Sequence, residues 1–159
     1  AAQAGAKIVF LPELTLSRYM ADTMPTDTPN LLAEDLETGS TYRFAAKAAA
    51  ENNVHVHISL YEHQPFADGR GLNVAIIVDP AGRIIARTPK LHIPVTAGYY
   101  EDKYFAEGPA DGEPYPVYEL EFDQTVANIG LPTCWDEWFA EVVRNYSLRG
   151  AELLAAADG

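Results

Sequence analysis

The chain has 159 residues, of which 48% are hydrophobic and 21% charged, and its formal net charge is -12. This length and this balance predict one folded domain with a core of its own and exclude an intrinsically disordered chain. The negative charge argues against a nucleic-acid partner, and no apolar run reaches the length of a membrane span, so we expect neither nucleic-acid nor membrane binding.

The N-terminal third predicts a short strand, a long connection and one helix. Residues Ala1–Gly5 resemble the tail of a helix, and we expect no secretory signal there. The apolar run Ile8–Leu11 predicts a strand that is buried on both faces, with Glu13 at its C-terminal end. The polar connection over 15–39 is long enough to cover a site. The alanine-rich segment from about Ser40 or Thr41 to Asn52 predicts a helix.

The middle of the chain predicts a hairpin and a second long connection. Val54–Tyr61 and Leu72–Val78 are rich in β-branched residues and predict two strands. The turn signal Asp79–Gly82 joins the second strand to a further one at Arg83–Arg87, so these two form a hairpin. Residues 90–113 are rich in aromatic residues and proline and predict a loop.

The C-terminal third predicts two strands near Val117–Phe122 and Thr125–Leu131, a helix at Trp138–Leu148, and the start of a last strand after Gly150. Helices therefore alternate with strands, while two strand pairs look antiparallel. These features indicate the α/β class, in a layered α+β arrangement without an internal repeat. A Rossmann fold is excluded, because no G-x-G-x-x-G follows a strand.

Cys134 is the only cysteine and stands between a predicted strand and a predicted helix. A thiol in the first turn of a helix, which Thr133 or Asp136 could cap, faces unpaired N–H groups that favour the nucleophilic thiolate. Taken alone, a lone cysteine is more often an inert buried side chain. A single cysteine also excludes an internal disulfide and fits a reducing compartment, from which we infer the cytoplasm.

Three further charged residues are candidates for a site. Glu13 ends an apolar strand, where its carboxylate would lose hydration and could exchange protons near neutral pH, although a helix cap or a surface salt bridge explains it equally well. Lys90 leaves another strand and could stabilise an oxyanion beside a cysteine, although most lysines are simply exposed. Glu101 could hydrogen-bond Lys90 or a substrate, or could be a solvated loop charge.

His55 and His57 alternate along one face of a predicted strand, a pattern that is compatible with metal ligation. No third ligand follows at a recognisable spacing. A partly buried pair satisfied by its neighbours is the simpler interpretation, so we predict that these histidines bind no metal. The sequence supports a catalytic serine triad even less than a metal site, because no G-x-S-x-G is present.

Three separated segments, in the right order, resemble the nitrilase superfamily of carbon-nitrogen hydrolases. Gly5–Leu14 is similar to the segment that carries the catalytic glutamate, Arg87–Pro94 to the catalytic-lysine segment, and Gly130–Trp138 to the nucleophile segment. Two stretches, Gly98–Phe105 and the Cys-Trp-Asp-x-Trp-Phe run, resemble N-carbamoylputrescine amidases and β-ureidopropionases more than ordinary nitrilases.

The resemblance implies an α-β-β-α sandwich. It covers nearly the whole of residues 1–159, which we expect to be one carbon-nitrogen hydrolase domain shortened at both ends. The catalytic residues that it implies are Glu13, Lys90, Cys134 and Glu101. The residues that we expect to contact substrate are Trp135, Tyr104 and His92, and the backbone N–H of Trp135 would join Lys90 in the oxyanion site.

The implied reaction is hydrolysis of an N-carbamoyl amine, such as the N-carbamoylputrescine of polyamine metabolism, to amine, ammonia and carbon dioxide. Cys134 would attack the carbamoyl carbon, Glu13 would move the protons and Lys90 would stabilise the anion, and no metal or organic cofactor is needed. The partners would be a small-molecule N-carbamoyl amine or amide and, through the helix Trp138–Leu148, further copies of the chain in a homo-oligomer. Two alternatives stay open: a related aliphatic amidase that uses the same residues, and a non-catalytic fragment that serves oligomerisation or binding.

Overall fold

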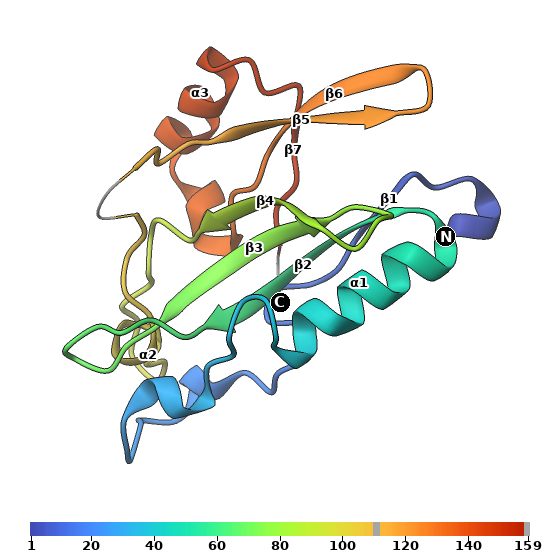
Figure 1. Ribbon diagram of the computed structural model, residues 1–159. Coiled ribbons are helices and arrows are strands. Elements are labelled where there is room, and N and C mark those ends of the chain that lie inside the picture. Colours follow the sequence, from blue (N-terminus) through green and yellow to red (C-terminus); the bar gives the residue numbers. More distant parts are fainter. Residues whose placement is uncertain (110–111, 158–159) are drawn as a thin grey trace.

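The computed structural model describes residues 1–109 and 112–157, which form two β-sheets with helices on their outer sides (Figure 1). The larger sheet consists, in spatial order, of β1 (Ile8–Phe10), β2 (His55–Glu62), β3 (Leu72–Val78) and β4 (Ile84–Pro89). β1 is parallel to β2, and the other neighbours are antiparallel. The smaller sheet consists of β5 (Val117–Phe122), β6 (Thr125–Gly130) and β7 (Leu153–Leu154).

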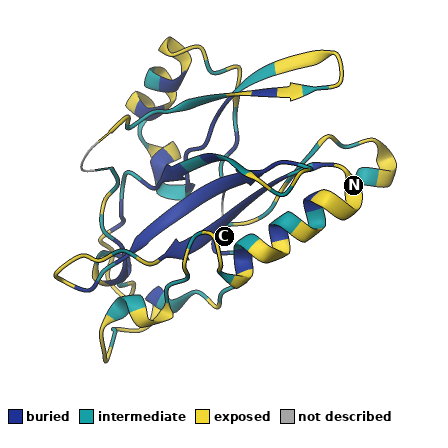
Figure 2. Ribbon diagram, in the orientation of Figure 1, coloured by how far each residue is buried: buried dark blue, intermediate teal, exposed yellow. Residues whose placement is uncertain are grey.

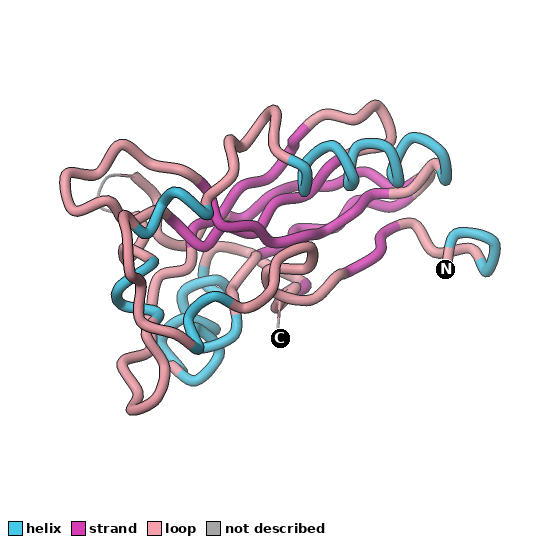
Figure 3. The backbone as a smooth tube through the Cα atoms, turned by 90° about the horizontal axis from the view of Figure 1, so that it is seen from below, coloured by secondary structure: helices cyan, strands magenta, loops and turns pink. Residues whose placement is uncertain are grey.

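The helix α1 (Ser40–Asn52) lies along the strands of the larger sheet (Figure 3). Its Ala45 and Ala49 are fully buried against apolar side chains of β2 and β3. The helix α3 (Ala140–Leu148) packs on the smaller sheet, where Tyr146 lies so close to Gly130 that an added Cβ would meet its ring at 2.4 Å. The layers therefore follow the order α-β-β-α, and the predicted sandwich is confirmed.

The core between the sheets is apolar. The larger sheet contributes Ala75, Ile77 and Ala86, and the smaller sheet and its flanking segments contribute Leu120, Ile129, Leu131 and Ala155. Because successive residues of a strand point to opposite faces, β3 buries Ala75 and Ile77 here and Val74 and Ile76 under α1, where the apolar residues of β2 also lie. Figure 2 shows both strands buried along almost their whole length. This double burial explains the nearly continuous apolar run of β3, whereas polar residues such as His57 and Ser59 alternate with apolar ones in β2.

The first strand differs from its prediction. β1 spans only Ile8–Phe10, none of its residues is buried, and Phe10 is 41% exposed. The prediction of a strand buried on both faces is therefore wrong. The reason is its position, since β1 is the edge strand of the described sheet and α1 packs mainly on β2 and β3.

The segment after Cys134 also differs. The predicted helix Trp138–Leu148 begins only at Ala140, because Phe139 has the extended backbone angles φ -102 and ψ 112. Cys134–Trp138 form a separate five-residue 3-10 helix, η4.

The predicted loop 90–113 contains a one-turn helix, α2 (Glu101–Tyr104), and its residues 110–111 lie outside the described residues. The other short helical turns are η1 (Ala2–Ala4), η2 (Met20–Asp22) and η3 (Pro29–Leu32).

Neither a membrane helix nor a metal cluster is present in residues 1–109 and 112–157. None of the helices there has the length and apolar character that crossing a bilayer requires. No group of three or more histidine, cysteine, aspartate and glutamate side chains is placed to hold a metal ion.

His57 is fully buried on the face of β2 that carries its register partner Ile77. Its ring packs near Phe10, with the ring centroids 5.5 Å apart, and neither ring nitrogen has a hydrogen-bond partner among the described residues. The expectation that neighbours satisfy this histidine is therefore wrong. Burial lowers the pKa of His57 from 6.5 to about 4, so the imidazole is neutral at neutral pH.

We expect the free energy of unfolding to fall as the pH is lowered from 6.5 to about 4. In this window the unfolded chain protonates the imidazole of His57 while the folded protein keeps it neutral, so the unfolded state binds more protons and is favoured. The loss should be complete below about pH 4 and amount to on the order of 3 kcal/mol. Denaturant unfolding over this pH range measures it. His57→Leu should remove most of the slope, and His55→Leu on the same strand should keep it; equal slopes in all three proteins would contradict the assignment.

Candidate active site

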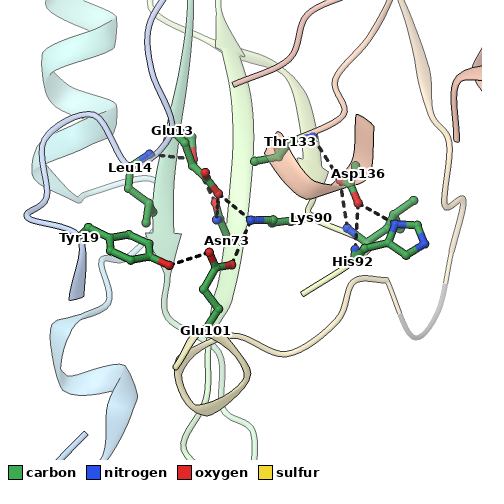
Figure 4. A network of polar contacts seen from close by, with 11 residues as sticks. Glu13, Leu14, Tyr19, Asn73, Lys90, His92, Glu101, Thr133 and Asp136 are labelled. Atoms are coloured by element: carbon green, nitrogen blue, oxygen red, sulfur yellow. Dashed lines mark hydrogen bonds and ion pairs between the residues drawn. The ribbon is translucent and has the colours of Figure 1, made fainter. Parts of the chain in front are cut away.

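Segments that are far apart in the sequence meet at one cavity of about 380 Å³. Glu13 follows β1, Glu101 opens α2 and Cys134 opens η4, and all three line this cavity. Lys90, which follows β4, reaches the same place with its ammonium group (Figure 4). The structure therefore brings together the four residues that were predicted to be catalytic. The other lining residues are Leu14, Ser17, Tyr19 and Tyr99.

Lys90 is a buried cation between two carboxylates. Its Nζ lies 2.9 Å from Glu13 Oε1 and 3.0 Å from Glu101 Oε2, and its side chain is 0% exposed. Burial alone lowers the pKa of Lys90, but the charges of Glu13 and Glu101 outweigh burial, so the pKa is raised above its usual value. Lys90 therefore keeps its proton at neutral pH, cannot act as a base, and can stabilise negative charge.

Tyr19 belongs to the site although sequence reasoning missed it. Its hydroxyl donates to Glu101 Oε1 at 2.7 Å, so Glu101 joins Tyr19 to Lys90 (Figure 4). Burial raises the pKa of Tyr19, and the hydrogen bond to the carboxylate raises it further, which keeps the hydroxyl a donor. No local pattern marks this tyrosine, because its partner lies 82 residues away.

Cys134 lines the cavity from a sharp turn in the backbone. Its φ is +46°, a left-handed conformation that costs a non-glycine residue free energy and that often occurs at functional sites. Leu14, directly after Glu13, has φ +48° at the same cavity. The expected first turn of an α-helix is a five-residue 3-10 helix instead, so the dipole of a long helix does not act on this thiol.

Asp136 connects the segment of Cys134 to the segment that follows Lys90. Its carboxylate accepts the backbone N–H of Thr133 at 3.1 Å, while the Thr133 hydroxyl has no hydrogen-bond partner among the described residues. The carboxylate also accepts the backbone N–H groups of Leu91 at 3.3 Å and His92 at 2.9 Å (Figure 4). The side chain of Asp136 is 2% exposed. This buried carboxylate therefore fixes the turn before Cys134 relative to the residues just after Lys90.

The three residues predicted to contact substrate are not among the lining of this cavity in the described part of the chain. His92 is bound to Asp136 through Nδ1 at 2.8 Å and stacks on Phe139. The ring of Trp135 stacks on that of Trp138. Tyr104 donates to the carbonyl of Thr23 and lines a separate cavity of about 410 Å³.

Two buried polar residues behind Glu13 were also missed. Asn73 donates to Glu13 Oε1 at 2.6 Å, and Ser59 donates to Asn73 Oδ1 at 3.0 Å. A signal exists in the sequence for Asn73, which is the one polar residue of the otherwise apolar strand β3, but not for Ser59, because β2 also contains His55, His57 and Glu62. Such residues are retained in a core where they are hydrogen-bonded.

The chain is similar to known hydrolases over its length. A family model described as carbon-nitrogen hydrolase matches residues 1–159. A citrullinase of Francisella tularensis is 31% identical over 155 residues, which are 97% of this chain and 50% of that protein. An N-carbamoylputrescine amidase of Arabidopsis thaliana is 31% identical over 150 residues, 94% of this chain and 46% of that protein. The chain thus spans about half the length of the curated relatives that it matches.

Solved structures have the same fold. A carbon-nitrogen hydrolase from Helicobacter pylori G27 aligns with a TM-score of 0.77 and 28% identity, covering 96% of this chain and 48% of that one. An amidase from Nesterenkonia sp. aligns with a TM-score of 0.70 and 21% identity, covering 99% and 54%.

Proposed function

The chain belongs to the carbon-nitrogen hydrolase family, and we propose that the protein hydrolyses an N-carbamoyl amine with Cys134 as its nucleophile. The observation that carries this proposal is the convergence of a cysteine, two carboxylates and a buried lysine on one cavity. Acyl transfer through a thiol requires a nucleophile, a proton carrier and a stabiliser of the oxyanion. The geometry supports Glu13 as the proton carrier and Lys90 as the stabiliser.

In the first half of the reaction, the sulfur of Cys134 attacks the carbamoyl carbon while Glu13 accepts the thiol proton. The resulting oxyanion is stabilised by Lys90 and by the backbone N–H of Trp135. An ammonium group has three donors, and Lys90 uses two of them on carboxylates, so the third serves the oxyanion. The carbon-nitrogen bond then breaks, and the nitrogen leaves as ammonia with the proton from Glu13.

In the second half, Glu13 accepts a proton from water, and the oxygen attacks the carbonyl carbon of the thioester. The thiolate of Cys134 leaves and is protonated again, and the released carbamic acid separates into amine and carbon dioxide. One N-carbamoyl amine and one water therefore give one amine, one ammonia and one carbon dioxide. Glu101, held by Tyr19, keeps Lys90 in place and charged through these steps.

The charge of the site supports a cationic substrate. Two carboxylates, Glu13 and Glu101, face the single ammonium of Lys90, which leaves a net negative charge beside the cavity. A substrate with an amine tail, such as N-carbamoylputrescine, is attracted by this field, and a carboxylate is repelled. Curated relatives at about 31% identity include enzymes named for that substrate, so we propose a role in polyamine metabolism.

We further propose that residues 1–159 are part of one catalytic domain that works as a homo-oligomer in the cytoplasm. The segment η4–α3 supports self-association, because Trp138 is 77% exposed and Leu148 72% exposed there. Large apolar side chains at the surface favour a protein interface. The single cysteine of this chain supports a reducing compartment.

The test is a substrate panel with the complete natural protein. We expect equal amounts of ammonia and carbon dioxide from N-carbamoylputrescine, with kcat/KM at least about tenfold higher than for an N-carbamoyl amino acid of similar length, because repulsion of the carboxylate costs about 1.4 kcal/mol or more. Plain aliphatic carboxamides serve as the matched control. Ammonia without carbon dioxide, from carboxamides alone, would establish the aliphatic amidase instead. No turnover of any substrate would favour a binding module.

A further inference from the structure

Ser59 and Asn73 are two polar side chains in the most buried part of the larger sheet, where they are 0% and 1% exposed. The register pairs Ser59 with Ala75 and Tyr61 with Asn73, so Ser59 and Asn73 are diagonal neighbours on one face. Burying a hydroxyl and an amide in a core is unfavourable unless both are hydrogen-bonded. The hydrogen-bond partners of Ser59 and Asn73 therefore indicate the role of these two residues.

These two residues close a ring of hydrogen bonds on Glu13 and the residue after it. The backbone N–H of Leu14 donates to Ser59 Oγ at 3.3 Å, and the Ser59 hydroxyl donates to Asn73 Oδ1 at 3.0 Å. Asn73 Nδ2 then donates to Glu13 Oε1 at 2.6 Å (Figure 4). The direction of the ring follows from chemistry, because a backbone N–H only donates and a carboxylate only accepts.

Asn73 also holds the lysine segment. The backbone N–H of Lys90 donates to the carbonyl of Asn73 at 2.8 Å. The same asparagine therefore holds Lys90 through its main chain and Glu13 through its side chain. Ser59 adds a second constraint, since it binds the N–H of Leu14 in the left-handed conformation that turns the chain just after Glu13.

The two oxygens of Glu13 are consequently different. Oε1 accepts from Asn73 at 2.6 Å and from Lys90 at 2.9 Å, and these two donors use both lone pairs of a carboxylate oxygen. We propose that Asn73 and Ser59 are positioning residues, which lock Oε1 of Glu13 so that Oε2 alone exchanges the proton with Cys134. This inference rests on the proposed role of Glu13 as the proton carrier.

The first test is Asn73→Leu in the complete natural protein. We expect kcat to fall by about tenfold to a hundredfold, because the carboxylate of Glu13 loses its orientation. KM should stay within about twofold, because the substrate keeps its contacts. The acidic limb of the profile of kcat/KM against pH should move to higher pH, because a hydrogen-bond donor to the carboxylate is lost. An unmoved acidic limb with only reduced stability would overturn the proposal.

Ser59 provides a conservative pair in case Asn73→Leu does not fold. Ser59→Thr keeps the hydroxyl and should retain the pH profile of the wild type, whereas Ser59→Ala should move it as Asn73→Leu does. Identical profiles for the two variants would overturn the proposal.

Thr88→Val is the matched control. Thr88 lies in β4, is 2% exposed, pairs with Ala75, and donates a hydrogen bond to Tyr118, which is outside the ring. It should lower stability and leave the pH profile unchanged.

A measurement without substrate separates this inference from the proposed function. Iodoacetamide alkylates the thiol of Cys134, and its rate against pH should have an acidic limb that moves upward in Asn73→Leu, since the same carboxylate accepts the thiol proton. If the wild type turns over no carbamoyl or amide substrate but this shift is seen, the proposed function fails and the role of Asn73 stands. If the wild type turns over a carbamoyl or amide substrate but Asn73→Leu shifts neither the kinetic nor the alkylation profile, the proposed function stands and the role of Asn73 fails.

Discussion

Replacing Cys134 with alanine is expected to abolish hydrolysis in the complete natural protein, with a loss of about four or more orders of magnitude in kcat. Alanine has no nucleophilic atom, so the covalent intermediate cannot form. Cys134→Ser should be nearly as inactive, because its hydroxyl is isosteric but far less nucleophilic. Ammonia release measures the loss, and a thermal melt together with competitive binding of substrate should show fold and affinity largely intact.

A second variant for this prediction is Glu13→Gln, which keeps the shape of the side chain and removes the proton carrier. It should also be nearly inactive, and the double variant Glu13→Gln with Cys134→Ala should be scarcely worse than Cys134→Ala alone, because residues that act as one unit have non-additive effects. Additive losses would mean that the two residues act independently. Rates close to those of the wild type from Cys134→Ala would end the hypothesis.

Lys90→Met is expected to reduce both activity and stability. The variant loses a donor to the oxyanion, which costs about a hundredfold or more in kcat. It also leaves Glu13 and Glu101, whose side chains are 7% and 6% exposed, facing each other without a cation. Leaving buried charge uncompensated costs about 3–5 kcal/mol of folding free energy. Steady-state kinetics and denaturant unfolding measure the two effects.

Lys103 offers a matched control for this prediction. It lies in α2, its side chain is 49% exposed, and it pairs with Asp102 at 2.6 Å. Because exposed ion pairs contribute about 1 kcal/mol or less, Lys103→Met should keep nearly the full stability and activity. Lowering the pH should restore part of the stability of Lys90→Met, since protonation removes charge from the carboxylate pair. Equal behaviour of the two lysine variants would contradict the electrostatic role of Lys90.

Elements with local signals could be predicted from the amino-acid sequence. The alanine-rich run predicted a helix from Ser40 or Thr41 to Asn52, where α1 spans Ser40–Asn52, and the β-branched run predicted β3 at Leu72–Val78. Both patterns arise because a helix or strand with a buried face repeats its apolar residues at its own period. Glu13, Lys90 and Cys134 could be singled out for a related reason, since each stands where an apolar run or strand ends and its motif lies in adjacent residues.

The hydrogen-bond partners of these residues depend on the tertiary structure. Tyr19 donates to Glu101 across 82 positions and Asn73 to Glu13 across 60, and such pairs leave no period in the sequence. Burial was decided in the same way: Phe10 is exposed because β1 lies at the edge of the described sheet. Tyr104 stands in the motif of Glu101 and yet lines a different cavity, because its hydroxyl is bound to the carbonyl of Thr23. A motif fixes which residues are adjacent in the chain, but the direction of a side chain depends on the distant segment that packs against it.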